Sequence, residues 1–422
     1  MENIDQMKQV KVEVMNLVSR EFSDDIASMD EQREFVSQRL DEVFENMPLE
    51  LDAGQRERFH SELLNELAGY GPIQPLLDDQ GNSEVMVMGP KQVYIERQGK
   101  LLETNIVFDD DDHVMRVINR ILHPLGLQVD WESPTADGRL PDGSRVNVVI
   151  PPVSIDGPCI TIRKFLNTGF SIPELIEFKS LTSHIAEFLE ACVKTRLNIL
   201  ISGNTSSGKT TLLNVLSGFI PDDERILTIE DAAELALGQK FLVRLETRPG
   251  NADGRGAITT RQLVRNSLRM RPDRIIVGEV RGEETIDMLQ AMNTGHDGSL
   301  CTLHSNSPRD AISRLETMVL MSGLDMPVVA IRKQISSAID LIVHMARLED
   351  GSRKVTRITE VTRMEGDVVT LSDIFLFQQT GKDQDGNILG EIRSTGLRPA
   401  FNPRLEMAGF RLRPQIFGAG TF

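Results

Sequence analysis

The sequence predicts an α/β fold in which a largely parallel sheet, covered by helices, follows a small α+β domain and an N-terminal helical segment. In the second half of the chain, short apolar runs alternate with helical patterns, which gives parallel strands with helices on both faces. In the first half, helical spacing gives way to short alternating segments separated by turns. At 422 residues the chain is too long for one core, so we expect two or three domains.

The N-terminal segment, residues 1–68, carries apolar residues at helical spacing and predicts a small helical bundle. The apolar positions form three blocks: Met7, Val10, Val14 and Leu17; Phe35, Leu40, Val43 and Phe44; and Phe59, Leu63, Leu64 and Leu67. These stripes suffice for a small core, and a docking role would rest on position alone.

Residues 69–166 predict the α+β domain, and residues 167–422 predict the α/β domain. In the first of these, strands are expected at 84–88, 93–97, 101–108, 145–150 and 159–165, with a helix over 114–122. A turn-rich joint, residues 166–173, precedes the second. Its apolar strands are expected at 198–201, 225–229, 274–277 and 299–303, with strands and helices alternating to the end.

The net charge and the spacing of the cysteines disfavour several classes of function. The net charge of −17 gives no global reason to approach nucleic acid or an anionic membrane. We interpret one local basic stripe as a helix and turn with solvated or phosphate-facing side chains: Arg261, Arg265, Arg269, Arg271 and Arg274. Cys159, Cys192 and Cys301 have neither disulfide nor zinc spacing. The acidic N-terminus and the lack of an apolar run near the roughly 20 residues that span a bilayer predict a cytoplasmic protein.

The sequence Gly203-Asn204-Thr205-Ser206-Ser207-Gly208-Lys209-Thr210 matches the phosphate-binding pattern GxxxxGK[ST] between a predicted strand and a predicted helix. Glycines let backbone N–H groups point at phosphate oxygens, and the helix adds its positive end. Lys209 would neutralise phosphate charge, and Thr210 would ligate Mg²⁺. We expect nucleotide contacts from all eight residues and from Thr211.

Polar residues end the neighbouring strands of the same predicted sheet, where open α/β sheets bind ligands. Glu279 can orient or deprotonate a water, or reach the metal through water, and Glu230 lies near the metal. His296 and His304 stand at the two ends of one strand. Each is either a structural hydrogen-bonding group or a sensor of phosphate.

In this order, the motifs resemble those of the type II/type IV secretion ATPases, the VirB11-like traffic ATPases, and in particular the branch that powers tight-adherence pili. The resemblance rests on Gly203–Thr210, the acidic box Thr228–Asp231, the Walker B region Arg271–Arg281, the histidine box Thr302–Asn306, and the segments Gly138–Arg145 and Thr161–Phe165. It runs from about Tyr70 to the C-terminus.

The resemblance implies a RecA-like ATPase domain that uses ATP and Mg²⁺ and works in a homo-hexameric ring. Such a ring is cytoplasmic and is held at an inner-membrane platform by partners of a pilus or secretion machine. Arginines of the small domain complete the nucleotide site of the ring, and the matching positions are Arg139, Arg145 and Arg163. The four-cysteine insertion of some type II members is missing, so no zinc is expected.

Three alternatives share the phosphate-binding loop. A RecA-like hexameric nucleic-acid translocase would need a basic channel bearing aromatic residues, which 5% aromatic content and the net charge of −17 disfavour. A GTPase would need an Asn-Lys-x-Asp type motif after the loop, which the sequence lacks. A nucleotide-binding scaffold without turnover is disfavoured by the full set of carboxylates and histidines.

Overall fold

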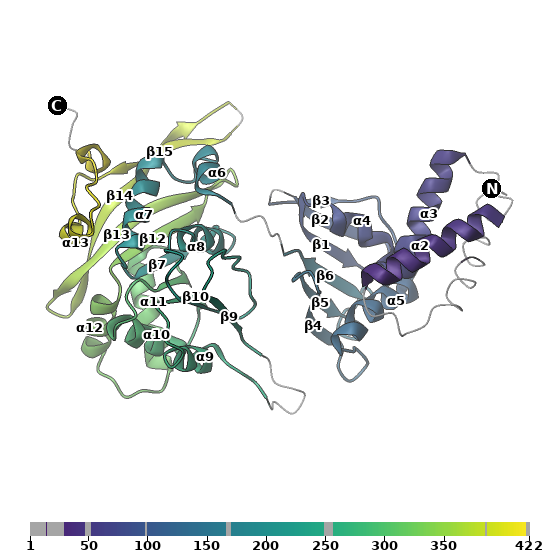
Figure 1. The fold of residues 1–422 in the computed structure, drawn as a ribbon, viewed down its shortest axis with the longest axis horizontal. Coiled ribbons are helices and arrows are strands. Elements are labelled where there is room, and N and C mark those ends of the chain that lie inside the picture. Colours follow the sequence, from purple (N-terminus) through teal and green to yellow (C-terminus); the bar gives the residue numbers. More distant parts are fainter. Residues whose placement is uncertain are drawn as a thin grey trace. The chain divides into compact units, whose positions relative to one another are not determined.

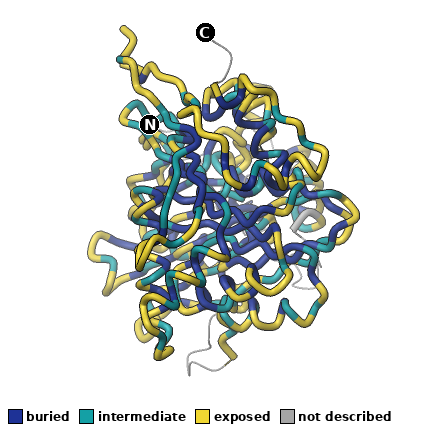
Figure 2. Tube along the Cα trace, turned by 90° about the vertical axis from the view of Figure 1, so that its left-hand side faces the viewer, coloured by how far each residue is buried: buried dark blue, intermediate teal, exposed yellow. Residues whose placement is uncertain are grey.

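The computed structural model describes residues 14, 29–46, 52–97, 99–165, 170–248, 256–384 and 386–418, and it divides into two compact units, Met1–Leu166 and Asn167–Phe422 (Figure 1). The expected division of the first unit at residue 68 stays a prediction. Figure 2 shows the buried segments as dark blue stretches of the chain, with exposed loops in yellow.

Two described helices, α2 (Met29–Asn46) and α3 (Ala53–Ala68), occupy the N-terminal segment where the second and third apolar blocks lie. Asp52 begins α3 with a reciprocal capping box to Gln55. The two helices share a small core in which the rings of Phe44 and Phe59 stack 5.7 Å apart. Of the first predicted helix, Met7, Val10 and Leu17 lie outside the described residues.

The first unit contains a six-stranded antiparallel sheet in the order β3-β2-β1-β6-β5-β4. Its strands are β1 (Asn82–Met88), β2 (Gln92–Arg97), β3 (Lys100–Glu103), β4 (Thr135–Arg139), β5 (Arg145–Val149) and β6 (Cys159–Arg163). Its helical elements are η1 (Gly71–Ile73), α4 (Gln74–Asp78), α5 (Asp111–Leu122) and η2 (His123–Leu125). One face of the sheet packs against the apolar side of α5, and the two form one buried core. The alternation of buried and exposed residues along β5 and β6 produces this two-faced sheet.

Two details of this sheet differ from the prediction. The strand expected at 101–108 ends at Glu103, because the chain then turns so that the Phe108 N–H donates to the carbonyl of Pro90 and the Phe108 ring becomes buried. Strand β4 was not expected, since Asp137 and Gly138 are poor strand residues. It forms through pairing with β5.

The second unit contains a nine-stranded sheet in the order β15-β14-β13-β12-β7-β11-β10-β8-β9. The strands are β7 (Ile199–Gly203), β8 (Ile226–Glu230), β9 (Leu242–Glu246), β10 (Arg274–Val280), β11 (Leu300–His304), β12 (Leu341–Arg347), β13 (Arg353–Glu365), β14 (Val368–Lys382) and β15 (Ile388–Ser394). Strands β12, β7, β11, β10, β8 and β9 are parallel. The four predicted strands of this domain are confirmed as β7, β8, β10 and β11.

The expectation of alternating strands and helices to the end of the chain is wrong beyond β12. Strands β13, β14 and β15 follow one another as antiparallel neighbours, joined by short connections. Such connections do not require the helical crossover that parallel strands need. The α/β pattern therefore gives way to an antiparallel extension of the same sheet (Figure 1).

Helices cover both faces of the large sheet. They are α6 (Ile172–Glu177), α7 (Ser183–Lys194), α8 (Lys209–Ser217), α9 (Thr260–Ser267), α10 (Glu284–Asn293), α11 (Pro308–Met321), α12 (Val328–Ala338), α13 (Asn402–Met407) and the short turn η3 (Pro414–Phe417). One core contains residues of α7, α8 and the C-terminal segment, and the other contains residues of α9 to α12. In the first core the ring of Phe188 lies 5.3, 6.3 and 6.0 Å from those of Phe375, Phe401 and Phe417.

Part of the basic stripe predicted from the sequence is buried. Arg274 is fully buried, and its guanidinium donates to both carboxylate oxygens of Glu224 and, at 3.0 Å, to the carbonyl of Gly298. Arg261 binds Glu283 and Asp287 at 2.6 and 2.8 Å. The interpretation of solvated or phosphate-facing side chains is therefore wrong for Arg274, because a parallel strand of the core carries it inward.

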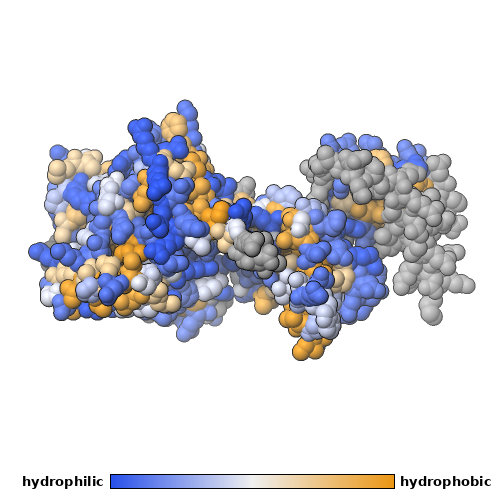
Figure 3. Space-filling view, turned by 90° about the horizontal axis from the view of Figure 1, so that it is seen from below, coloured by the Kyte–Doolittle hydropathy of each residue, from blue (hydrophilic) through white to orange (hydrophobic). Residues whose placement is uncertain are grey.

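Within the described residues, no helix combines the length and apolar character that a membrane span requires. The surface in Figure 3 is mostly hydrophilic on both units, with hydrophobic side chains gathered in places on each.

Candidate nucleotide-binding site

The loop between β7 and α8, residues 203–210, has the backbone of a phosphate cradle. Gly203 has φ 155°, and a Cβ atom there would collide with the carbonyl oxygen of Met345, so only glycine fits. Gly208 has φ 93°, and Ser206 also has a positive φ, 57°. The loop thus bends twice before α8 begins at Lys209.

The chemistry of this loop fits a phosphate group. Gly208 caps α8 without a side-chain hydrogen bond, so the backbone N–H groups of the first turn face the loop. The hydroxyl of Ser207 is buried and has no hydrogen-bond partner in the described chain. Lys209 Nζ donates to the Asn204 carbonyl at 3.0 Å, across the mouth of the loop. Burial lowers the pKa of Lys209, and the nearby Glu279 carboxylate opposes that shift.

Glu279 lies near the C-terminal end of β10 and is brought to the loop. It exerts an electrostatic effect on Lys209, and its Oε2 accepts a hydrogen bond from Arg281 Nη2 at 2.6 Å. Arg281 also lies 3.3 Å from Asp231, which follows β8. The hydrogen bond to Glu279 raises the pKa of Arg281. Arg281 therefore joins the ends of two strands, a role that its place in a sequence motif did not reveal.

Glu230 ends β8 and is 3% exposed. Its Oε1 accepts the backbone N–H groups of Glu234 at 2.8 Å and Leu235 at 3.0 Å, whereas its Oε2 is buried without a partner in the described chain. Burial raises the pKa of Glu230, and those two N–H groups oppose the shift. The Glu230 carboxylate therefore stabilises the turn after β8, and its second oxygen has no hydrogen-bond donor in the described chain.

The two histidines of the sequence prediction lie at opposite ends of β11. His304, at the C-terminal end, has Nδ1 3.5 Å from the hydroxyl of Thr205 in the phosphate loop. His296 precedes β11, and its carbonyl accepts the Ser299 hydroxyl at 2.8 Å. Because the five-residue strand β11 separates the two histidines, the structure brings His304 and not His296 to the phosphate loop of the same chain, and a catalytic role for His296 stays a prediction.

The match to a known family decides the assignment. The family described as type II/IV secretion system protein matches residues 66–387, well over half of the chain. The chain belongs to this family. A Mycobacterium tuberculosis protein named for conjugal transfer is 38% identical over 312 residues, which cover 72% of this chain and 88% of that protein.

Other relatives agree with this assignment. The type IV secretion system protein VirB11 of Bartonella henselae is 32% identical over 326 residues, which cover 68% of this chain and 90% of VirB11. A crystal structure of the pilus retraction motor PilT with bound ADP is 19% identical, with a TM-score of 0.50 over 80% of this chain and 86% of that chain. That likeness shows the RecA-like α/β fold. The protein is a secretion ATPase of the VirB11 kind.

In this secretion ATPase, the three arginines predicted from the resemblance form a row across the small sheet. Arg139 of β4 pairs with Arg145 of β5, Arg145 pairs with Arg163 of β6, and Glu84 of β1 follows. Directly opposed residues of antiparallel strands share a face. Arg163 Nε lies 3.5 Å from Glu84 Oε1. The sheet thus gathers three cations from separate sequence motifs.

A further arginine, Arg353, was missed by the sequence analysis. It begins β13, and its Nε donates to the carbonyl of Ser206 at 2.9 Å. Its Cδ would lie 3.5 Å from a Cβ atom at Gly208. Arg353 supports the phosphate loop from the antiparallel extension, and Met345 of the parallel strand β12 contacts it as well. No sequence signal marks this role, because the bond joins residues 147 positions apart.

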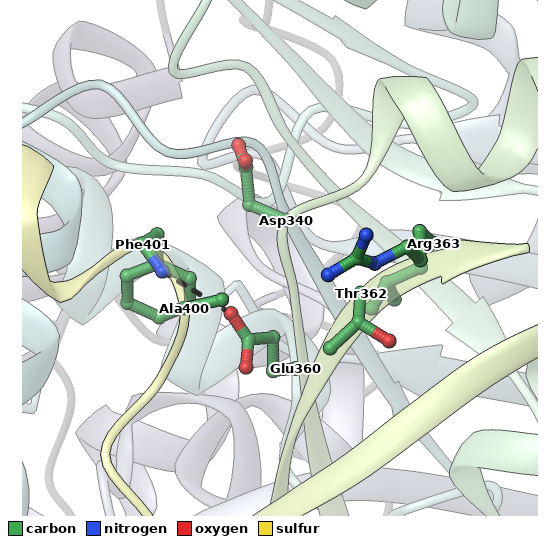
Figure 4. Close-up of a pocket in the computed structure, with 7 residues that line it drawn as sticks. Asp340, Glu360, Thr362, Arg363, Ala400 and Phe401 are labelled. Carbon is green, nitrogen blue, oxygen red and sulfur yellow. Dashed lines mark hydrogen bonds between the residues drawn. The ribbon is translucent and has the colours of Figure 1, made fainter.

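The secretion ATPase also contains a pocket of about 240 Å³ in the second unit (Figure 4). It is lined by Asp340, Glu360, Val361, Thr362, Arg363, Ala400 and Phe401. Glu360 accepts the Phe401 N–H at 3.3 Å, and Asp340 accepts Asn198 N–H and Arg404 at 2.8 Å each. Burial raises the pKa of both carboxyls. These bonds fasten the C-terminal segment to the sheet, away from the phosphate loop.

Proposed function

We propose that this secretion ATPase is a cytoplasmic homo-hexameric motor that hydrolyses ATP to drive pilus assembly, of the tight-adherence kind, or protein secretion through an inner-membrane platform. The observation that supports it is the meeting of Lys209, Glu279 and the N-terminus of α8 at the C-terminal ends of the parallel strands. The family match supplies the secretion context.

The loop residues from Gly203 to Thr211 would bind the phosphates of ATP, with backbone N–H groups inside the loop and Lys209 at the outer phosphates. Thr210 would hold Mg²⁺, which neutralises phosphate charge when bound. In the described chain, no group of three or more His, Cys, Asp or Glu side chains could hold a metal ion. Magnesium takes many of its ligands from phosphates and water. The expected absence of zinc stays a prediction.

Glu279 is the better candidate than Glu230 for orienting the attacking water. Glu279 is partly exposed and lies beside Lys209 and Arg281. Glu230 has a raised pKa and already accepts two backbone hydrogen bonds. We therefore assign Glu230 to holding the turn after β8 and to the metal side of the site through water. His304 would sense the phosphates through Thr205.

The arginine row would supply the positive charge that the phosphate loop lacks. The described site of the second unit offers Lys209 to the outer phosphates, while Arg281 is engaged by Glu279 and Asp231 and Arg353 by the Ser206 carbonyl. Charge on the transferred phosphoryl group needs further stabilisation. In a ring, Arg139, Arg145 and Arg163 of a small unit would close over the nucleotide, so that hydrolysis depends on assembly.

Two variants test this proposal together. Glu279→Gln should still bind ATP with Mg²⁺ but hydrolyse it at least about 100-fold more slowly, because the amide keeps the shape and loses the charge. Alanine variants at Arg139, Arg145 or Arg163 should fold and bind ATP but hydrolyse it poorly. Mixing one of them with Lys209→Ala subunits should restore turnover, measured by phosphate release.

The control for the mixing experiment is Arg116→Ala, an exposed arginine of α5 in the same unit. It should keep wild-type turnover. ATPase activity that is unchanged on dilution to the monomer would refute the ring mechanism. Stimulation by single-stranded DNA that weakens with salt would instead support a nucleic-acid translocase.

A further inference from the structure

Five exposed apolar side chains lie in the loops at one end of the small sheet. Their exposed fractions are 53% for Met88, 53% for Val107, 76% for Trp131, 59% for Val153 and 92% for Ile155. This is the end at which β1 and β5 finish and β4 and β6 begin. The row of arginines lies at the opposite end of the same strands.

Backbone hydrogen bonds and close contacts join the loops into one surface. The Gly89 N–H donates to the Pro158 carbonyl at 3.0 Å, and the Ile150 N–H donates to the Pro134 carbonyl at 2.9 Å. The Phe108 N–H donates to the Pro90 carbonyl at 2.7 Å. A Cβ atom on Gly157 would lie 3.1 Å from the Asp111 carboxylate. We call this surface, made of residues 88–91, 107–112, 130–134 and 150–158, the loop end.

The loop end is strongly acidic. It carries seven carboxylates against a single lysine, Lys91. The acids are Asp109, Asp110, Asp111, Asp112, Asp130, Glu132 and Asp156, and all seven are exposed. Asp110 caps α5, and Asp130 accepts the backbone N–H groups of Glu132 and Ser133 in its own turn. Exposed apolar groups are therefore surrounded by negative charge.

The charge determines what this surface can bind. Grouped exposed apolar residues mark interaction sites, and their acidic surroundings repel phosphate groups of nucleic acid and of anionic lipids. The same charge attracts lysine and arginine across an interface. We propose that the loop end is a docking surface for a lysine- and arginine-rich amphipathic segment of a protein partner, whose apolar residues pack on Trp131, Val153 and Ile155.

A membrane protein is the source to which we commit. Cytoplasmic loops of membrane proteins carry an excess of lysine and arginine. This choice of source rests on the proposed function, in which the motor works on an inner-membrane platform. The docking surface itself does not depend on ATP hydrolysis.

Trp131 allows a direct test, because it is the chain's single tryptophan and lies within the loop end. The probe is a synthetic amphipathic helix of leucine and lysine without tryptophan, titrated into the full chain at about 0.15 M salt. Binding should shift the Trp131 emission to shorter wavelength, as the indole leaves water. An emission that stays unchanged at saturating peptide would overturn the proposal.

Variants locate the binding. The pair Val153→Ser and Ile155→Ser should weaken binding roughly tenfold, and the pair Glu132→Gln and Asp156→Asn should weaken it about threefold and flatten its salt dependence. Matched controls are Leu101→Ser, an apolar residue on β3 that is 66% exposed, and the pair Asp222→Asn and Asp223→Asn in the second unit. Equal weakening in the controls would show nonspecific attraction to an acidic protein and refute the site.

Two further measurements separate the other occupants. Sedimentation of the wild type and of the Ile155→Ser variant tests for a second copy of the chain. If the wild type self-associates and the Ile155→Ser variant does not, a second copy of the chain occupies the loop end, and the proposal of a lysine- and arginine-rich partner is wrong. Preferential binding to vesicles of anionic lipid over the peptide would overturn it as well. ATPase activity should be equal in wild type and docking variants, so a missing ATPase would contradict the proposed function and leave peptide binding as a separate result.

Discussion

The parallel strands of the second unit end in two differently built edges. At the N-terminal edge, Arg274 is bound by Glu224 and by the Gly298 carbonyl, and the Asn198 side chain accepts the N–H groups of Gly298 and Ser299. At the C-terminal edge, the Ser207 hydroxyl and Glu230 Oε2 are buried beside the glycine-rich loop without a hydrogen-bond partner in the described chain, whereas His296 Nδ1 before β11 is such a group at the N-terminal edge.

The difference supports the proposal that the N-terminal edge maintains the fold and that the C-terminal edge receives the nucleotide. Buried polar groups in folded proteins are normally hydrogen-bonded, so the pairing at the N-terminal edge stabilises the sheet. Unmatched groups beside a glycine-rich loop cost stability until another molecule supplies their partners. Changes at the two edges should therefore separate stability from activity.

The largest effect is expected from Lys209→Ala at the C-terminal edge. In the proposed site Lys209 binds phosphate from the first residue of α8, so turnover should fall about 100-fold or more and ATP binding should weaken, whereas the melting temperature should stay unchanged. Phosphate release and thermal unfolding measure the two quantities. Lys333→Ala on the exposed side of α12 is the matched control. Wild-type turnover in Lys209→Ala would remove the loop from the active site.

A smaller effect, on stability instead of turnover, is expected from Arg274→Met at the N-terminal edge. It leaves the buried Glu224 without its main partner, which should lower the free energy of unfolding by roughly 3 kcal/mol. This loss is near the lower limit of what breaking a buried ion pair costs, because Arg196 Nη2 lies 3.3 Å from Glu224 and still offers it a positive charge. Denaturant titration measures it, and adding Glu224→Gln should recover part of the loss.

The affinity for ATP should depend on the C-terminal edge and not on the N-terminal edge. The Arg274→Met variant should therefore bind ATP as tightly as the wild type at temperatures where the variant is folded. A large loss of nucleotide affinity at unchanged stability would break the distinction between the two edges.

The smallest effect concerns Glu230 and pH. Burial raises the pKa of Glu230 in the folded chain, so the folded state holds this proton to higher pH than the unfolded state does. Stability is then favoured below the ordinary glutamate pKa and declines as the pH rises through the raised value. Glu230→Gln should remove that part of the decline. Unfolding free energies of both proteins across this range test it, and identical slopes would contradict the shift.

The sequence was sufficient for features that depend on short segments. The phosphate loop, the strand before it and the carboxylate after β10 could be predicted because turn chemistry and apolar runs are local. The sequence also placed His296 and His304 at the two ends of one strand, which the structure has as β11, but a role for His296 stays a prediction. Arg353 and the pairing of Arg274 with Glu224 depend on contacts between distant segments, and neither has a local signal. The arginine row needed the strand register, which pairing alone sets.

The core beneath the phosphate-loop strand also has a consequence for synthesis of the protein. Ile199 and Ile201 of β7 share one core with Leu405, Ile416 and Phe417. On the ribosome, β7 is made long before those last residues, so it must remain without part of its packing while the rest of the unit is translated. Contacts of such long sequence separation form slowly, and uncovered apolar strands aggregate. We therefore expect a nascent chain of this secretion ATPase to be protected by chaperones until the segment with Leu405, Ile416 and Phe417 has been made.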